Sequence, residues 1–172
     1  MSVQPAMRVT PAEAVPAVPL HLVLVEPQIP PNTGNVARLC AATGCALHLV
    51  EPLGFSIDDR ALKRAGLDYW AALVVIVHPS LDDFLRRFPP EGVWLLSTRA
   101  ARSYRAAPFA FGDALVFGKE TAGLPGALLA AHGERSLRIP MRRGAVRSIN
   151  LSTAVGVVAY EALAQLGFPA MQ

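Results

Sequence analysis

Short apolar runs alternate along this chain with segments of helical pattern, and this alternation most narrows the folds it can adopt. Strand-like runs bounded by turn residues are expected at Leu20–Val25, Ala46–Val50, Leu73–Val77, Val93–Ser97, Ala114–Phe117 and Ser136–Ile139. Helices are expected at Asn32–Ala42, Asp58–Ala65, Leu81–Phe88, Gly126–Ala131 and Leu151–Leu166. Because continuous apolar strands alternating with helices are typical of a sheet covered on both faces, the pattern predicts an α/β fold, a mostly parallel sheet flanked by helices.

Length and composition indicate one globular domain. Of the 172 residues, 52% are hydrophobic and 17% are charged, which is enough for a sizeable core. Four prolines interrupt residues 1–19, so we expect a flexible tail there and a single domain over residues 20–172. No apolar run approaches the length of a membrane span, and Glu13 and the prolines interrupt any signal-peptide region. We therefore expect a cytoplasmic protein without a membrane partner.

Residue types that bind metals or act as nucleophiles are sparse. The two cysteines, Cys40 and Cys45, have no partner pair at zinc spacing. The four histidines are scattered singly, at His21, His48, His78 and His132. We interpret each histidine as a strand-end or surface residue, and we expect no bound metal. No G-x-S-x-G turn is present to expose a nucleophilic serine.

The standard nucleotide-binding motifs are also missing. After the first expected strand, Glu26–Gly34 has prolines where a dinucleotide fold needs G-x-G-x-x-G. Glu51 matches the ribose-binding acid of such folds, but without the glycines a Rossmann-type dehydrogenase is a remote alternative. Gly118–Thr121 only partly matches a phosphate-binding loop, since a glutamate stands where Ser or Thr should follow the lysine.

The basic residues favour a phosphate-containing partner without proving one. The net charge is only +3, but all except two of the sixteen basic residues are arginine, whose forked guanidinium matches phosphate. An alanine- and arginine-rich chain can also reflect the base composition of its gene. Composition alone therefore leaves nucleic-acid binding open.

Three segments that follow expected strands are rich in turn residues and hydrogen-bonding side chains. In the third, Ser148, Asn150 and Ser152 occupy alternate positions around the start of the last helix, which exceeds what a helix cap requires. Loops at the carboxyl ends of parallel strands are where open α/β sheets bind ligands, so the segments predict a shared site. Taken alone, each is explained at least as well by a helix start, a turn or a cap.

Together the three segments resemble the motifs of the SPOUT-class RNA ribose 2′-O-methyltransferases. Pro27–Cys40 resembles the first motif, Phe117–Pro125 the second and Ile139–Ser152 the third. Two further segments, Leu47–Phe55 and Arg64–Trp70, are similar to the subgroup that methylates the wobble ribose of tRNA. The resemblance covers nearly the whole chain after the tail.

The resemblance implies properties that composition and periodicity do not show. It implies a deep C-terminal trefoil knot, a homodimer, S-adenosylmethionine as cofactor, and the tRNA anticodon loop as partner, with cytidine or modified uridine as the methylated nucleotide. By motif position, the cofactor pocket would be formed by Leu96, Thr98, Gly118, Glu120, Ile139, Ser148 and Leu151. Gly118 would let backbone amides approach the ligand, while Ile139 and Leu151 would sandwich an adenine.

For the reaction itself, the resemblance points to Arg38, Ser148 and Asn150 as catalytic residues. We expect Arg38 to grip a phosphate and stabilise developing charge on the ribose oxygen, because a guanidinium stays charged and is not a base. Ser148 and Asn150 would fix the geometry of the hydroxyl and the phosphate. Contacts to RNA are expected from Arg38, Arg142, Arg143 and Arg147.

Two departures from the family and two alternative functions stay open. The loop Arg142–Arg147 is more basic than in many relatives, and its contribution to RNA binding is open. Lys119 stands where the family usually has proline, which either loosens the loop or adds a phosphate contact. The same chemistry could act on ribosomal RNA or another tRNA position. A knotted RNA-binding protein without catalysis is the second alternative, and the presence of Arg38, Gly118, Ser148 and Asn150 argues against it.

Overall fold

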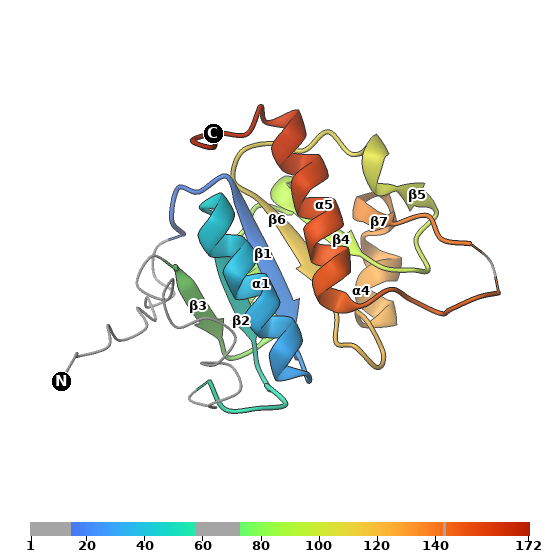
Figure 1. Cartoon of the computed structure of the whole chain (residues 1–172). Coiled ribbons are helices and arrows are strands. Elements are labelled where there is room, and N and C mark those ends of the chain that lie inside the picture. Colours follow the sequence, from blue (N-terminus) through green and yellow to red (C-terminus); the bar gives the residue numbers. More distant parts are fainter. Residues whose placement is uncertain (1–14, 58–72, 143) are drawn as a thin grey trace.

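The computed structural model describes residues 15–57, 73–142 and 144–172 (Figure 1). In this part of the chain, seven strands form one sheet in the order β3-β2-β1-β6-β4-β7-β5. The strands are β1 (Leu20–Val25), β2 (Ala46–Val50), β3 (Val75–His78), β4 (Val93–Leu96), β5 (Arg102–Ser103), β6 (Asp113–Phe117) and β7 (Ser136–Arg138). All neighbouring strands run parallel. The expected α/β class with a mostly parallel sheet is confirmed.

Helices cover both faces of the sheet. They are α1 (Pro30–Thr43), α3 (Leu81–Leu85), α4 (Gly126–Ala131) and α5 (Leu151–Gln165), with 3-10 turns at Pro90–Gly92, Tyr104–Ala106 and Gly133–Arg135. The helices α1 and α5 lie side by side on one face (Figure 1), and the core beneath them includes Leu22 and Leu24 of β1. Val23 and Val25 point to the opposite face and pack with Phe84 of α3. Both faces are buried, which explains the continuous apolar strands.

The sequence located most elements closely. The strands β1 and β2 and the helix α4 have the expected bounds, whereas β3 begins at Val75 instead of Leu73. The short strand β5 was not expected, because two polar residues carry no readable period. The expected helix over 58–65 and residues 1–14 of the expected tail lie outside the described residues. Within the described ranges, no helix is long and apolar enough to cross a membrane.

Three histidines form a buried chain across β1, β2 and β3, on the face that α3 covers. His21, His48 and His78 are each 1% exposed. The rings of Phe84 and Phe88 pack edge-on against them. The interpretation of every histidine as a strand-end or surface residue is therefore wrong for His48, which lies in the middle of β2. Sequence spacing cannot show this arrangement, because the three residues meet only through strand pairing.

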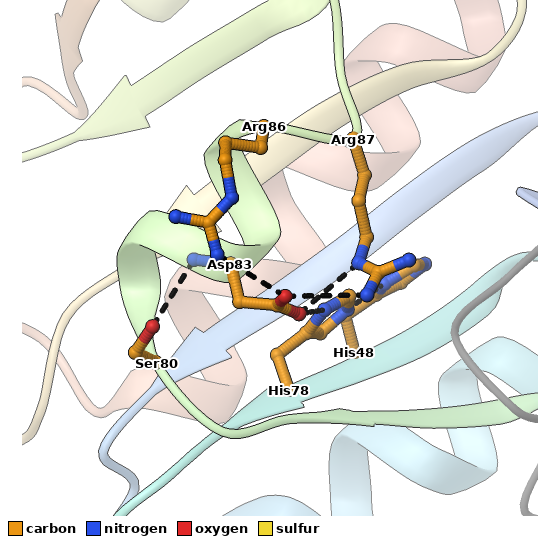
Figure 2. A network of polar contacts seen from close by, with 6 residues as sticks. All are labelled: His48, His78, Ser80, Asp83, Arg86 and Arg87. Atoms are coloured by element: carbon orange, nitrogen blue, oxygen red, sulfur yellow. Dashed lines mark hydrogen bonds and ion pairs between the residues drawn. The ribbon is translucent and has the colours of Figure 1, made fainter.

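The carboxylate of Asp83 lies at the His78 end of the row of three histidines and sets the direction of the hydrogen bonds along it (Figure 2). Asp83 accepts from His78 Nδ1 at 3.3 Å and is also bound by Arg87. His78 Nε2 then accepts from His48 Nδ1 at 2.9 Å, and His48 Nε2 accepts from His21 Nδ1 at 2.9 Å. Since an ionised carboxylate only accepts, each neutral ring donates from Nδ1.

Candidate functional site

The loops that follow β1, β6, β4 and β7 meet at one edge of the sheet, because these parallel strands are neighbours in that order. They surround a cavity of about 790 Å³. Its lining includes all seven residues expected to form a cofactor pocket: Leu96, Thr98, Gly118, Glu120, Ile139, Ser148 and Leu151. The structure thus gathers these residues at the carboxyl ends of the strands, where ligands of open α/β sheets bind.

Gly118 allows the loop after β6 to fold back on itself. A Cβ atom at this position would lie 2.1 Å from the carbonyl carbon of Gly123 and 2.2 Å from the nitrogen of Leu124. The turn is closed by Gly123 N–H, which donates to the Lys119 carbonyl at 2.8 Å. Gly123 has φ of +69°, which favours glycine. Both glycines of the second motif are therefore required by backbone geometry.

Glu120 lines the cavity and ties the loop after β6 to the loop after β1. Its Oε2 accepts from the backbone N–H of Gln28 at 2.9 Å. Its Oε1 accepts from the Ile29 N–H at 3.2 Å and from Asn32 Nδ2 at 3.0 Å. Ile29, which precedes α1, makes no side-chain cap. A carboxylate from a distant loop therefore supplies the acceptor at the start of this helix.

Asn32 carries this connection to the third motif. Its Oδ1 accepts from Asn150 Nδ2 at 2.9 Å. Asn150 in turn caps α5, since its Oδ1 accepts from Ser152 N–H at 2.9 Å and from Thr153 N–H at 3.3 Å. The unusual polarity before the last helix thus has a local part, the cap, and a long-range part, the bond to Asn32. Sequence reasoning missed Asn32, whose only signal was its place in the first motif.

Basic side chains dominate the charged part of the cavity lining. Arg99, Lys119 and Arg147 line it, and Glu120 is the one acidic residue among the described lining residues. Arg99, which sequence reasoning also missed, donates to the Leu124 carbonyl at 3.1 Å. Arg99 and Arg147 therefore favour a ligand or substrate that carries negative charge.

Two of the other predicted arginines lie outside the cavity lining. Arg38 is exposed on α1, and Arg142 is exposed after β7. Neither belongs to the described lining, whereas Arg147 does. Arg143 lies outside the described residues. Across the part of the chain that the structure describes, no group of three His, Cys, Asp or Glu side chains could hold a metal ion.

The parallel sheet and the cavity at the carboxyl ends of its strands define the class: an α/β protein with a candidate ligand site at that edge. Comparison of the sequence with known protein families then gives the family. A model of the SpoU rRNA methylase family matches residues 19–160. The chain therefore belongs to the SpoU rRNA methylase family.

Similar proteins narrow the comparison further. The tRNA (cytidine(34)-2′-O)-methyltransferase of Saccharophagus degradans is 50% identical over 149 residues, which cover 86% of this chain and 96% of that protein. A solved structure concerning the 2-OH methylation of C/U34 on tRNA has a TM-score of 0.81 at 49% identity, and covers 88% of this chain and 99% of that chain. An AdoMet-bound rRNA methyltransferase from Sinorhizobium meliloti has a TM-score of 0.78 at 24% identity, over 92% of this chain and 62% of that chain, which shows the shared fold.

Proposed function

We propose that this protein is an S-adenosylmethionine-dependent tRNA methyltransferase that methylates the ribose 2′-hydroxyl of nucleotide 34, a cytidine or a modified uridine. The observation that carries this proposal is the meeting of the three motif segments around one cavity. The names of the S. degradans relative and of the solved structure supply the nucleotide and the position. A ribosomal RNA or another tRNA position is the alternative substrate.

The cavity fits S-adenosylmethionine, which supplies a reactive methyl group on its sulfonium. A cavity of about 790 Å³ is in the range that holds cofactors of this size. Ile139 and Leu151 are half-buried apolar side chains beside the core and would sandwich an adenine. The missing Cβ of Gly118 leaves the backbone close to the cavity, where amide groups can bind the ligand.

Polar residues at the start of α5 would orient the ribose. Ser148 and Asn150 both line the cavity, and Asn150 is held by its cap to α5 and by Asn32. Arg38 on α1 would meet the RNA at the rim, where its permanent charge grips a phosphate and stabilises negative charge on the attacking oxygen. Arg142, Arg143 and Arg147 would add phosphate contacts.

We also propose a homodimer and a C-terminal knot. Three apolar side chains in and after α5 stay exposed, Val157 at 37%, Tyr160 at 45% and Phe168 at 40%, and a second copy would bury them. For the knot, the supporting observation is the strand order, in which β7 lies between β4 and β5 although β5 follows β4 along the chain.

The decisive experiment is methyl transfer from labelled S-adenosylmethionine to total tRNA that lacks the modification, followed by mapping of the label. We expect label on the 2′-oxygen of nucleotide 34. Label at another position would keep the chemistry and refute the substrate. Cofactor binding without transfer to any RNA would favour the RNA-binding protein without catalysis.

The role of Arg38 has a separate test. Arg38→Ala should lower turnover by about 100-fold or more, the usual loss for a group that stabilises developing negative charge, while the cofactor dissociation constant changes little. Arg86→Ala is the matched control, because Arg86, the residue that follows α3, has a side chain that is 71% exposed. Equal losses of turnover and cofactor affinity in Arg38→Ala would refute the assignment.

A further inference from the structure

Lys119, which lines the cavity, forms an ion pair with Glu26 of the loop after β1. Lys119 Nζ lies 2.6 Å from Glu26 Oε2, with the two side chains 34% and 35% exposed. Lys119 directly follows Gly118 and lines the cavity, while Glu26 directly follows β1. The pair thus joins the residues that follow two neighbouring parallel strands, β6 and β1.

Separate hydrogen bonds hold the backbone and the side chain of Glu26. Its φ is +49°, a left-handed conformation that a residue with a Cβ adopts at a cost in free energy. The Glu26 N–H donates to the Val50 carbonyl at 2.9 Å, which holds the backbone on one side. The bond from Lys119 holds the side chain on the other.

Lys119 is the first of three consecutive residues that all reach the segment 26–32. Glu120 accepts from Gln28, Ile29 and Asn32, as described above. Thr121 Oγ1 donates to Gln28 Oε1 at 2.7 Å. Because Asn32 also binds Asn150, the position of 26–32 sets the position of the polar start of α5. The loop after β6 therefore clamps two of the other walls of the cavity.

We propose that Lys119 is a positioning residue: its ion pair with Glu26 holds the loop after β6 against the loop after β1 and preforms the S-adenosylmethionine pocket. This inference rests on the proposed function. It differs from the two consequences that the sequence suggested for Lys119, a loosened loop or an added contact to an RNA phosphate. The loop is tied instead of loosened, and the ammonium charge is already neutralised by a carboxylate 2.6 Å away instead of being directed at an RNA phosphate.

The pair is expected to act on cofactor affinity and not on the rate of transfer. Neither residue belongs to the group assigned to the ribose, which is Arg38, Ser148 and Asn150. Without the ion pair, the loop after β1 must become ordered when the cofactor binds, and the free energy of this ordering reduces the affinity. Once the cofactor is bound, the loop is in place and turnover is unchanged.

The test is a double-mutant cycle read by calorimetric binding of S-adenosylmethionine without tRNA. Lys119→Met and Glu26→Gln should each weaken binding about threefold, in keeping with a partly exposed pair. The double variant should bind no more weakly than the single variants, because each change breaks the same contact. Lys119→Arg should keep most of the affinity, and turnover at saturating cofactor should stay within about twofold throughout.

A matched control is Arg105→Met, which removes an exposed ion pair to Glu161 of α5 with an N–O distance of 4.0 Å and should leave cofactor binding unchanged. Additive losses in the double variant, or unchanged affinity in both single variants, would overturn the proposal. So would unchanged cofactor binding in Lys119→Met with weaker tRNA binding and a salt slope reduced by about one, the signature of a phosphate contact. Binding of S-adenosylmethionine by the wild type with no label on nucleotide 34 would instead refute the proposed function while leaving the positioning role intact.

Discussion

Acidification should destabilise this protein through the buried histidine chain well before its carboxylates titrate. Burial lowers the pKa of His21 from the ordinary 6.5 to about 4. Burial, together with the neighbouring His21 and His78, also lowers the pKa of His48 well below its ordinary value. The pKa of His78 is lowered mainly by burial, although Asp83 opposes that shift. All three rings are thus held neutral in the folded state.

The size of the effect follows from proton linkage. Near pH 6.5 the unfolded chain takes up a proton on His21, whereas the folded chain does so only near pH 4. The stabilisation is therefore complete above pH 6.5 and is lost progressively as the pH falls toward 4. The difference between the ordinary pKa of 6.5 and the folded-state pKa of about 4 corresponds to about 3 kcal/mol, to be compared with the 5 to roughly 15 kcal/mol that is typical of a folded domain. The pKa values of His48 and His78 are also lowered, so these residues add to the loss of stability in acid.

The assay is urea unfolding across the range from about pH 7 to about pH 4.5, which reports the free energy of unfolding at each pH. His21→Asn is the informative variant, because its amide nitrogen can donate to His48 Nε2 without titrating. Its free energy of unfolding should fall less steeply with acid than that of the wild type. The control is His132→Asn, because His132 is exposed and does not belong to the row of three buried histidines. Equal pH dependence in the wild type and in His21→Asn would refute the reasoning.

Three further changes test separate parts of the structure. Gly118→Ala places a methyl group 2.1 Å from the backbone of Gly123, so calorimetry should show loss of cofactor binding; retained affinity would mean that the turn can shift. Trp94→Phe removes the 2.7 Å bond from the indole to the buried carboxylate of Asp113, and urea unfolding should show a loss of about 1 to 3 kcal/mol. Ser80→Ala removes the side-chain cap of α3 and should lower the free energy of unfolding by about 1 kcal/mol, with no change expected in cofactor binding.

Local pattern was sufficient to locate the central strands. All six residues of β1 and all five of β2 are buried, because helices cover both faces, so each strand stands out as an unbroken apolar run. The helix α4 was located with its bounds. β5 was not, since Arg102 and Ser103 are polar and form a strand only by pairing with β7. A strand that forms only through pairing with a neighbouring strand has no recognisable pattern in its own sequence.

In the candidate site, too, the sequence predicted some features and only the structure showed the others. Motif resemblance named seven of the residues that line the cavity, because their identities are readable one segment at a time. It did not show that Glu120 holds Asn32, that Asn32 holds Asn150, or that Lys119 pairs with Glu26. Each of these contacts joins residues about 90 or more positions apart.

Periodicity and residue type therefore determined the class of fold, the strands at its centre and the segments that carry chemistry, because burial on two faces and turn geometry act within a few residues of chain. The strand order decided the rest. It set β1 beside β6 and β7 between β4 and β5, and so determined which loops share a cavity, which side chains meet across it, and which histidines line up beneath α3. Pairing between distant strands depends on the free energy of the whole packed sheet, which no single segment encodes.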